Sequence, residues 1–194
     1  MALIVQKYGG TSVGSIERIE AVAERVAKHH AAGDQLIVVV SAMSGETNRL
    51  LGLAGEISNS PDPRELDMLV STGEQVSMAL LAMALHKRGI GAISLKGSQV
   101  AIKTDSFHSK ARIKDIDATR LHTELANGKV VIVAGFQGVD EQGETTTLGR
   151  GGSDTSAVAL AGAVARVLRC GSAGWCRQTL SWVQRRTATR VPPR

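Results

Sequence analysis

The sequence predicts an α/β fold in which a mostly parallel β-sheet lies between layers of helices. Short runs of β-branched and aliphatic residues alternate along the chain with longer segments whose apolar residues recur at helical spacing. Segments rich in glycine, serine and threonine follow these runs. With right-handed crossovers, such polar segments fall at the carboxyl ends of the strands, where open α/β sheets bind their ligands.

The first strand, loop and helix are predicted from residues 2–33. Ala2–Gln6 is an apolar run that leads into a turn at Gly9-Gly10, as expected of a buried strand that feeds a loop. A helix follows, with Ser12 or Ser15 as its candidate N-cap. Its apolar face is formed by Ile16, Ile19, Val22 and Val26.

The pattern then repeats along the chain. Leu36–Val40 is continuous and rich in valine, which is typical of a parallel strand covered on both faces. The later predicted elements, in chain order, are a helix at Gly73–Lys87, a short apolar segment at Ile90–Leu95, a helix at Ala118–Ala126, a strand at Lys129–Phe136, a hairpin or excursion at Gly138–Thr147 and a helix at Thr155–Leu168.

Length and composition indicate one globular domain. The chain has 194 residues and 43% apolar content, enough for a real core and too much for a disordered protein. Unbroken aliphatic runs such as Leu36–Val40 are far shorter than the roughly 20 residues that a membrane helix needs. The N-terminal residues show neither a basic region nor a cleavage site. We therefore expect a cytoplasmic protein with no membrane partner.

The positive net charge is confined to the C-terminal segment. Seven of the 23 basic residues lie in residues 166–194, which contain no acid, so residues 1–165 carry 16 bases against all 18 acids. The body therefore has no electrostatic footprint for nucleic acid. A nucleic-acid binder with a basic tail is a weaker alternative, and its mark would be salt-dependent binding that is lost when residues 166–194 are deleted.

Metal binding and disulfide formation are not predicted. Both cysteines, Cys170 and Cys176, lie in the C-terminal segment without a nearby histidine, and this spacing does not make a zinc site. The five histidines are scattered along the chain without metal-ligand spacing. We expect no metal-binding residues.

The segment Leu148–Thr155 carries the strongest functional signal. Its glycines flank Arg150, and Ser153-Asp154 then opens an apolar helix. Glycine lets the main chain approach a ligand closely, and a helix N-terminus favours an anion through its unpaired N–H groups and its dipole. An arginine between glycines suits a bidentate grip on a carboxylate. A phosphate or carboxylate ligand is therefore predicted.

Three further polar segments are predicted, like Leu148–Thr155, to lie where strands end. Lys7–Ser12 places a cation before glycines and hydroxyls; it is not a Walker A loop, and it could be only a tight turn before a capped helix. Ser41–Asn48 offers hydroxyls but could be a loop with a capping residue. Ser71–Glu74 opens a helix, where Glu74 could complement the dipole or receive a substrate ammonium group.

Taken together, these segments resemble the aspartate kinases of the amino acid kinase family. The resemblance covers residues 1–165 in unbroken order. It is carried by Lys7-Tyr-Gly-Gly-Thr-Ser12, Val40-Ser-Ala-Met43, Thr72-Gly-Glu74, Val133-Ala-Gly-Phe-Gln137 and Thr147-Leu-Gly-Arg-Gly-Gly-Ser-Asp154. It implies the carbamate kinase-like α/β fold of that family.

The resemblance also implies an activity. Aspartate kinases transfer the γ-phosphoryl group of Mg-ATP to the β-carboxylate of L-aspartate, the first step towards lysine, threonine and methionine. The pairing of Glu74 with Arg150 favours an amino-acid substrate over the carbamate or nucleotide substrates of sister kinases. ATP with Mg²⁺ enters as a substrate, and no tightly bound cofactor is expected. A homo-oligomer stays an open alternative to a monomer.

Residue roles follow from the same resemblance. The catalytic residues would be Lys7, at the transferring phosphoryl group, and Asp154, which would orient Lys7. The nucleotide phosphates would lie along Lys7, Tyr8, Gly9, Gly10 and Ser41. The aspartate would be held by Thr47, Glu74, Arg150, Gly151, Gly152 and Ser153, with Arg150 on its α-carboxylate and Glu74 on its ammonium group.

The chain departs from the family pattern after residue 165. Aspartate kinases continue with a strand and a Thr-Asp-Val-Asp-Gly-Val type of segment that helps to hold the nucleotide, whereas this chain continues with arginine, tryptophan and cysteine. We therefore expect residues 1–165 to form the aspartate-binding lobe and residues 166–194 to form an aberrant, poorly ordered tail. A frameshifted or truncated product, inactive for lack of the nucleotide half, is one hypothesis. A non-catalytic aspartate-binding fragment or partner subunit is the alternative.

Overall fold

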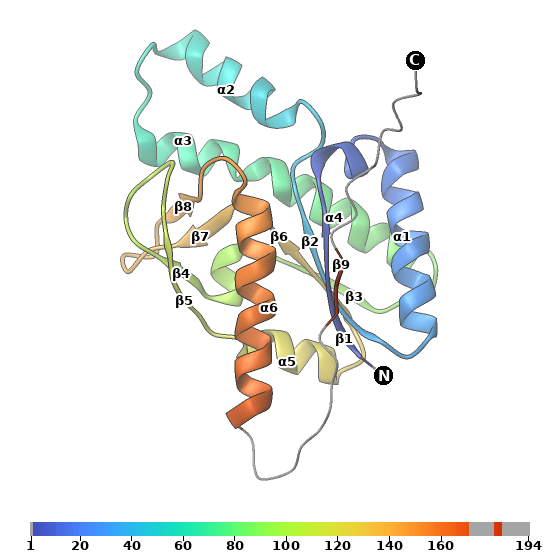
Figure 1. Cartoon of the computed structure of the whole chain (residues 1–194). Helices are drawn as coiled ribbons and strands as arrows, with labels where there is room; N and C mark the ends of the chain where they lie inside the picture. The colour runs from blue at the N-terminus through green and yellow to red at the C-terminus, as the bar shows by residue number, and fades with distance from the viewer. Residues whose placement is uncertain (1, 171–180, 184–194) are drawn as a thin grey trace, which may run out of the picture.

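A five-stranded parallel sheet forms the centre of the molecule. The computed structural model describes residues 2–170 and 181–183 (Figure 1). The strand order of this main sheet is β3-β6-β2-β1-β9, and every neighbouring pair is parallel. Its strands are β1 (Leu3–Tyr8), β2 (Gln35–Val40), β3 (Ala92–Leu95), β6 (Val130–Ala134) and β9 (Ser181–Val183).

A second, four-stranded sheet lies beside the main sheet. Its order is β5-β4-β7-β8, with antiparallel pairs at β4/β5 and β7/β8 and a parallel pair at β4/β7. Its strands are β4 (Ile102–Thr104), β5 (Ile113–Ile116), β7 (Gln137–Val139) and β8 (Thr145–Thr147). Figure 1 shows this sheet on the side of the molecule that is opposite α1.

Helices cover both faces of the main sheet. They are α1 (Ile16–Ala31), α2 (Glu46–Ile57), α3 (Pro63–Val70), α4 (Thr72–His86), α5 (Thr119–Ala126) and α6 (Gly152–Cys170), with short 3-10 turns η1 (Gly10–Val13) and η2 (Gly97–Val100). Side chains of α1 and α4 pack on one face of the sheet, and those of α5 and α6 pack on the other. The predicted sandwich of a mostly parallel sheet between helix layers is therefore confirmed.

The valine-rich strands are buried on both faces because alternate residues enter different cores. In β2, Val38 and Val40 pack with the α1 and α4 side, whereas Ile37 and Val39 pack with the α5 and α6 side. All four side chains are buried completely. Successive side chains of a strand point to opposite faces, so a continuous apolar run is what such a central strand requires.

Local signals explain where several helices begin. The Ser15 side chain caps α1 by accepting a hydrogen bond from the backbone N–H of Arg18 at 3.3 Å, so Ser15 rather than Ser12 is the cap. Asp62 caps α3, with Pro63 in its first turn.

The helices α2 and α3 and the strands β4 and β5 were not predicted.

The continuous helical stretch 63–86, formed by α3 and α4, has the length and apolar composition of a membrane-crossing helix. However, 56% of its most apolar window is buried inside the fold. Leu81 and Leu85 of α4 lie fully buried in the core on the α1 side. The apolar character of α4 is therefore explained by its position against the main sheet.

The C-terminal segment is described only in part. Helix α6 continues through Cys170, and β9 pairs with β1 in parallel at the edge of the main sheet. The predicted domain division at residue 165 and the predicted poor order of the tail concern mostly residues 171–180 and 184–194. Those residues lie outside the described part of the chain, so both statements stay predictions.

One stability prediction arises from the close packing of β6 against α6. A Cβ atom at Gly135 would lie 2.7 Å from the Cβ of Ser153 and 3.0 Å from the carbonyl oxygen of Val40. We expect Gly135→Ala to lower the free energy of unfolding by about 1–3 kcal/mol, measured by urea denaturation. Gly52→Ala is the control, because nothing lies within 4 Å of a Cβ there. It should raise stability by up to about 1 kcal/mol, as alanine does in an exposed helix. Equal effects of the two changes would contradict the packing argument.

Candidate functional site

Three parallel strands end together at one edge of the main sheet. Tyr8 of β1 is level with Val40 of β2, which in turn is level with Ala134 of β6. The backbone continues this alignment, since Ser41 N–H donates to the Tyr8 carbonyl at 3.0 Å and Gly135 N–H donates to the Val40 carbonyl at 2.9 Å. The loops that follow these strands are therefore held next to one another, as predicted for the ligand-binding edge of an α/β sheet.

A cavity of about 700 Å³ opens at this edge. Glycines, hydroxyl side chains and a few charged groups supply most of its wall. Eight of the predicted site residues line it, namely Gly10, Ser41, Thr47, Glu74, Arg150, Gly151, Gly152 and Ser153. They come from four separate segments, which the fold brings together. Three of these segments follow strands, as predicted, but the segment with Glu74 was wrongly placed at a strand end, because it lies between α3 and α4. The volume suits a small-molecule ligand.

Arg150 is the free cation of the cavity. It lies between Gly149 and Gly151, whose φ angles are +74° and +76°, a conformation that favours glycine. The Arg150 side chain is exposed and forms no hydrogen bond or ion pair with any other described residue. Helix α6 begins at Gly152, directly after this turn. A guanidinium and a helix N-terminus therefore face the same space, which favours an anion.

Glu74 is the buried anion of the cavity. It lies in the first turn of α4 and is only 4% exposed. Its Oε1 accepts a hydrogen bond from Ala42 N–H at 3.0 Å, whereas its buried Oε2 has no hydrogen-bond partner within the part of the chain that the structure describes. Burial raises the pKa of Glu74 to about 7, against the smaller opposing effect of the Ala42 hydrogen bond. A ligand cation at Oε2 would satisfy this group.

Lys7 and Asp154 form an ion pair beside the cavity. Lys7 Nζ lies 3.0 Å from Asp154 Oδ1, and this contact joins the end of β1 to the first turn of α6. Next to it, the hydroxyl oxygens of Ser41 and Ser153 lie 2.8 Å apart. The other predicted residues, Tyr8 and Gly9, follow Lys7 directly, and none of Lys7, Tyr8, Gly9 and Asp154 lines the cavity itself. The predicted site therefore divides into a cavity and an adjoining ion pair.

Sequence patterns did not predict several residues of the wall. Asp67 of α3 lines the cavity and is 1% exposed, and Ser109, from the loop between β4 and β5, lines it as well. A usable signal existed for α3, because Asp62-Pro63 is a strong helix-start pattern. Nothing local marked Asp67, since an acid within an amphipathic helix usually faces solvent.

Comparison with protein-family models identifies one family. The model of the amino acid kinase family matches residues 2–166 of this chain. That range contains every residue that lines the cavity and the Lys7–Asp154 pair.

Curated relatives and solved structures agree with this match. An aspartate kinase of Pseudomonas putida is 68% identical over 164 residues, which is 84% of this chain and 40% of that protein. Aspartokinase 2 of Bacillus subtilis is 56% identical with the same coverage. The structure of aspartate kinase from Synechocystis matches with a TM-score of 0.72 and 54% identity, over 84% of this chain and 27% of that one. E. coli aspartokinase III, solved in complex with aspartate and ADP, matches with a TM-score of 0.75 and 28% identity, over 84% and 47%. This chain thus spans about 40% of the length of these curated relatives.

Proposed function

Because the chain belongs to the amino acid kinase family, we propose that it acts as the aspartate-binding part of an aspartate kinase. The reaction is transfer of the γ-phosphoryl group of ATP to the β-carboxylate of L-aspartate, which gives 4-phospho-L-aspartate for lysine, threonine and methionine synthesis. The nucleotide substrate would be ATP in complex with Mg²⁺. We propose that the protein catalyses this reaction in the cytoplasm and that it has no membrane or nucleic-acid partner.

The observation that carries the proposal is the pairing of two unsatisfied, opposite charges in one cavity. Arg150 has no partner among the described residues, and Oε2 of Glu74 is buried without one. An α-amino acid carries a carboxylate and an ammonium group on the same carbon. L-Aspartate bound with its α-carboxylate at Arg150 and its ammonium group at Glu74 would satisfy both side chains. The second carboxylate would then be the phosphoryl acceptor.

The surrounding hydrogen-bond donors support this orientation. Thr47 lines the cavity and offers a hydroxyl group to the substrate. The backbone N–H groups of Gly151 and Ser153 lie at the start of α6, where the helix dipole favours a negative charge, whereas Gly152 N–H already donates to the Gly149 carbonyl. Together they would hold the anionic substrate and limit its rotation.

The phosphoryl-transfer side is proposed for the Lys7 end of the site. Phosphoryl transfer needs in-line positioning and neutralisation of charge more than covalent help from the protein. Lys7 would contact the transferring group, and Asp154, 3.0 Å away, would keep the ammonium group of Lys7 in place. The phosphates would lie along Tyr8, Gly9, Gly10 and Ser41. A side chain at Gly10 would collide with the Ala42 carbonyl, so glycine is needed at this position.

The division of the site into a cavity and an adjoining ion pair that does not line it supports a second candidate. The chain spans 40% of the length of the P. putida enzyme, so binding of aspartate and turnover with ATP are separate proposals. In the second candidate the chain is an aspartate-binding unit or partner subunit that does not turn over ATP. The cavity residues and their proposed roles are the same in both.

Calorimetry and an activity assay separate the two candidates. We expect L-aspartate to give a saturable binding heat with this chain at pH 8. Hydroxamate formed only when both ATP and aspartate are present would identify a kinase. Aspartate binding without ATP-dependent hydroxamate would identify the binding unit. Absence of any heat with aspartate would contradict the proposed function in both forms.

A further inference from the structure

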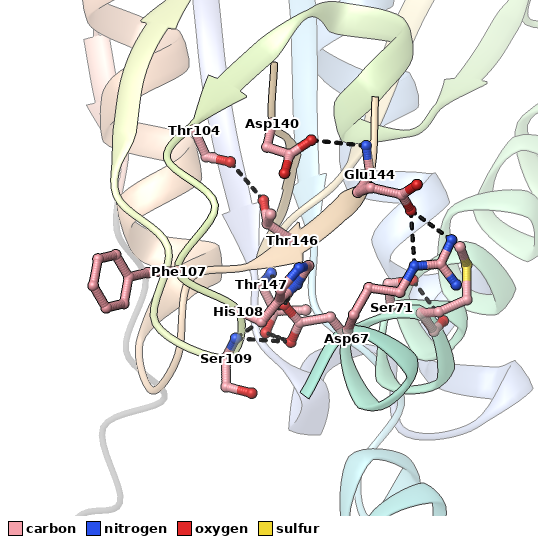
Figure 2. A network of polar contacts seen from close by, with 12 residues as sticks. Asp67, Ser71, Thr104, Phe107, His108, Ser109, Asp140, Glu144, Thr146 and Thr147 are labelled. Atoms are coloured by element: carbon pink, nitrogen blue, oxygen red, sulfur yellow. Dashed lines mark hydrogen bonds and ion pairs between the residues drawn. The ribbon is translucent and has the colours of Figure 1, made fainter. Parts of the chain in front are cut away.

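A buried carboxylate outside the proposed substrate contacts connects three segments around the cavity. Asp67 of α3 is 1% exposed, and its carboxylate contacts residues from distant parts of the chain. Its carboxylate accepts hydrogen bonds from Ser109 N–H at 2.9 Å, from Thr147 N–H at 3.0 Å and from the Thr147 hydroxyl at 2.5 Å. His108 Nδ1 lies 3.0 Å from Oδ2. Figure 2 shows these groups converging on Asp67.

The contacts of Asp67 fix the strand end that leads to Arg150. Thr147 is the last residue of β8, three positions before Arg150. Its N–H and hydroxyl bind Asp67, and its carbonyl accepts a hydrogen bond from Ala111 N–H at 2.8 Å. Leu148 N–H then donates to the Phe136 carbonyl at 2.9 Å. These hydrogen bonds therefore fix the main chain as far as Leu148, the residue before the glycine turn.

The loop that contains Ser109, which Asp67 also binds, packs against the same glycine turn. Ser109 has a φ angle of +66°, and its N–H is bound to Asp67. The Ser109 carbonyl would lie only 3.1 Å from a Cβ atom at Gly149, so this loop packs closely against the residue before Arg150. Beyond the turn, Gly152 N–H donates to the Gly149 carbonyl at 3.0 Å.

We infer that Asp67 is a positioning residue for the Arg150 guanidinium. The inference rests on the proposed function, and it adds a residue to which no substrate contact is assigned. The Arg150 side chain has no partner among the described residues, so no side-chain contact fixes its position. The position of the guanidinium therefore depends on the position of the Arg150 backbone. That backbone is placed by Thr147 and by the Ser109 loop, and both are held by the Asp67 carboxylate. Asp67 acts through Arg150 on one part of the ligand, the α-carboxylate.

The test compares two ligands that differ only at that group. One is L-aspartate, and the other is its α-amide, in which an uncharged amide replaces the α-carboxylate. Asp67→Asn puts an amide donor where the backbone N–H groups need an acceptor. We expect it to weaken L-aspartate binding roughly ten- to hundredfold, because small displacements of a clamp are costly. Binding of the α-amide, followed by NMR titration, should not change. A general loss of structure would weaken both ligands alike.

A pair of neighbouring threonines supplies a milder variant and its control. Thr147→Val removes only the hydroxyl bond to Asp67. Thr146→Val removes a similar buried bond on the same strand, the 2.6 Å contact with Thr104, which faces away from Asp67 (Figure 2). Thr147→Val should lower the preference for L-aspartate over the α-amide, and Thr146→Val should leave it unchanged. This pair decides the matter if Asp67→Asn does not fold.

The possible failures are distinct. If the unmodified chain does not bind L-aspartate, the proposed function is wrong and this inference falls with it. If the unmodified chain binds L-aspartate, two results overturn the inference alone. One is a folded Asp67→Asn variant that keeps the preference for L-aspartate over the α-amide, and the other is a Thr147→Val variant whose preference changes no more than that of Thr146→Val.

Discussion

Arg150→Ala is expected to abolish measurable binding of L-aspartate. Among the described residues that line the cavity, Arg150 is the only arginine, and its side chain has no competing partner in the described part of the chain. Removing it deletes a charge-assisted, bidentate contact with the α-carboxylate. The affinity should fall by at least about a hundredfold, beyond the range of ordinary calorimetry. Arg150→Lys should lie between, because lysine keeps the charge but loses the planar fork.

A second exposed arginine provides the control for the loss of one positive charge. Arg112 is exposed, lies on the loop that precedes β5 and does not line the cavity. Arg112→Ala should bind L-aspartate as the unmodified chain does. An unchanged affinity in Arg150→Ala would show that Arg150 does not bind the α-carboxylate. An equal loss in both variants would point to long-range electrostatics instead.

Glu74→Gln is expected to weaken aspartate binding by about a hundredfold, because the substrate ammonium group loses its buried counter-charge. The unmodified chain should also bind L-aspartate more weakly at pH 6 than at pH 8. Burial raises the pKa of Glu74 to about 7, so at pH 6 most molecules carry a neutral carboxyl group that attracts the ammonium poorly. Calorimetry at both pH values should show this difference, and the glutamine variant should show none.

The same substitution is expected to stabilise the unliganded chain. The folded-state pKa of Glu74 is raised above its usual value of 4.5, so the folded state binds the proton more tightly than the unfolded state does. Stability from this group is present below pH 4.5 and is lost as the pH rises through about 7. The loss amounts to about 3 kcal/mol. At pH 8, Glu74→Gln should therefore unfold at a higher urea concentration than the unmodified chain.

Glu74→Gln is thus expected to weaken aspartate binding and to stabilise the fold, and Glu124 provides the control for both effects. It is a buried glutamate as well, but it contacts Lys129 at 2.8 Å and Arg120 at 2.7 Å. These cations lower its pKa, so its stabilising effect is present above the ordinary value and is lost as the pH falls. Glu124→Gln should destabilise the chain at pH 8 and leave aspartate affinity unchanged. A destabilised Glu74→Gln variant with normal affinity would show that Glu74 is structural.

Much of the sheet and of the site could be predicted from the sequence because each part has a local signature. The strands β1, β2 and β6 each contain an apolar run, and glycine or hydroxyl segments follow each of them. Parallel strands end at one edge, so these segments had to meet there. That is why Gly10 and Ser41, which follow neighbouring strands, line one cavity. Glu74 joins them from the start of α4, and Arg150 joins them from the turn after β8.

The second sheet and the role of Asp67 could not be predicted in the same way. Strands β4 and β5 are short, and charged residues interrupt them, since Lys103 lies in β4 and Lys114 with Asp115 lies in β5. They are stabilised by neighbours that are distant in the sequence, such as β7. Asp67 is buried only because Ser109 and Thr147 bring donors to it. Such tertiary pairing leaves no periodic trace in a single sequence.

Proton release on aspartate binding at pH 7 tests the central claim most directly. Titrations of this chain with L-aspartate in buffers of different ionisation enthalpy measure how many protons leave per ligand bound. At a pH equal to the pKa of Glu74, half of the molecules carry its proton, and the arriving ammonium group must displace it. We expect a fraction of a proton, near one half, to leave per aspartate bound to the unmodified chain, and none to leave from Glu74→Gln. Binding of L-aspartate without proton release from the unmodified chain would contradict an ammonium site at Glu74.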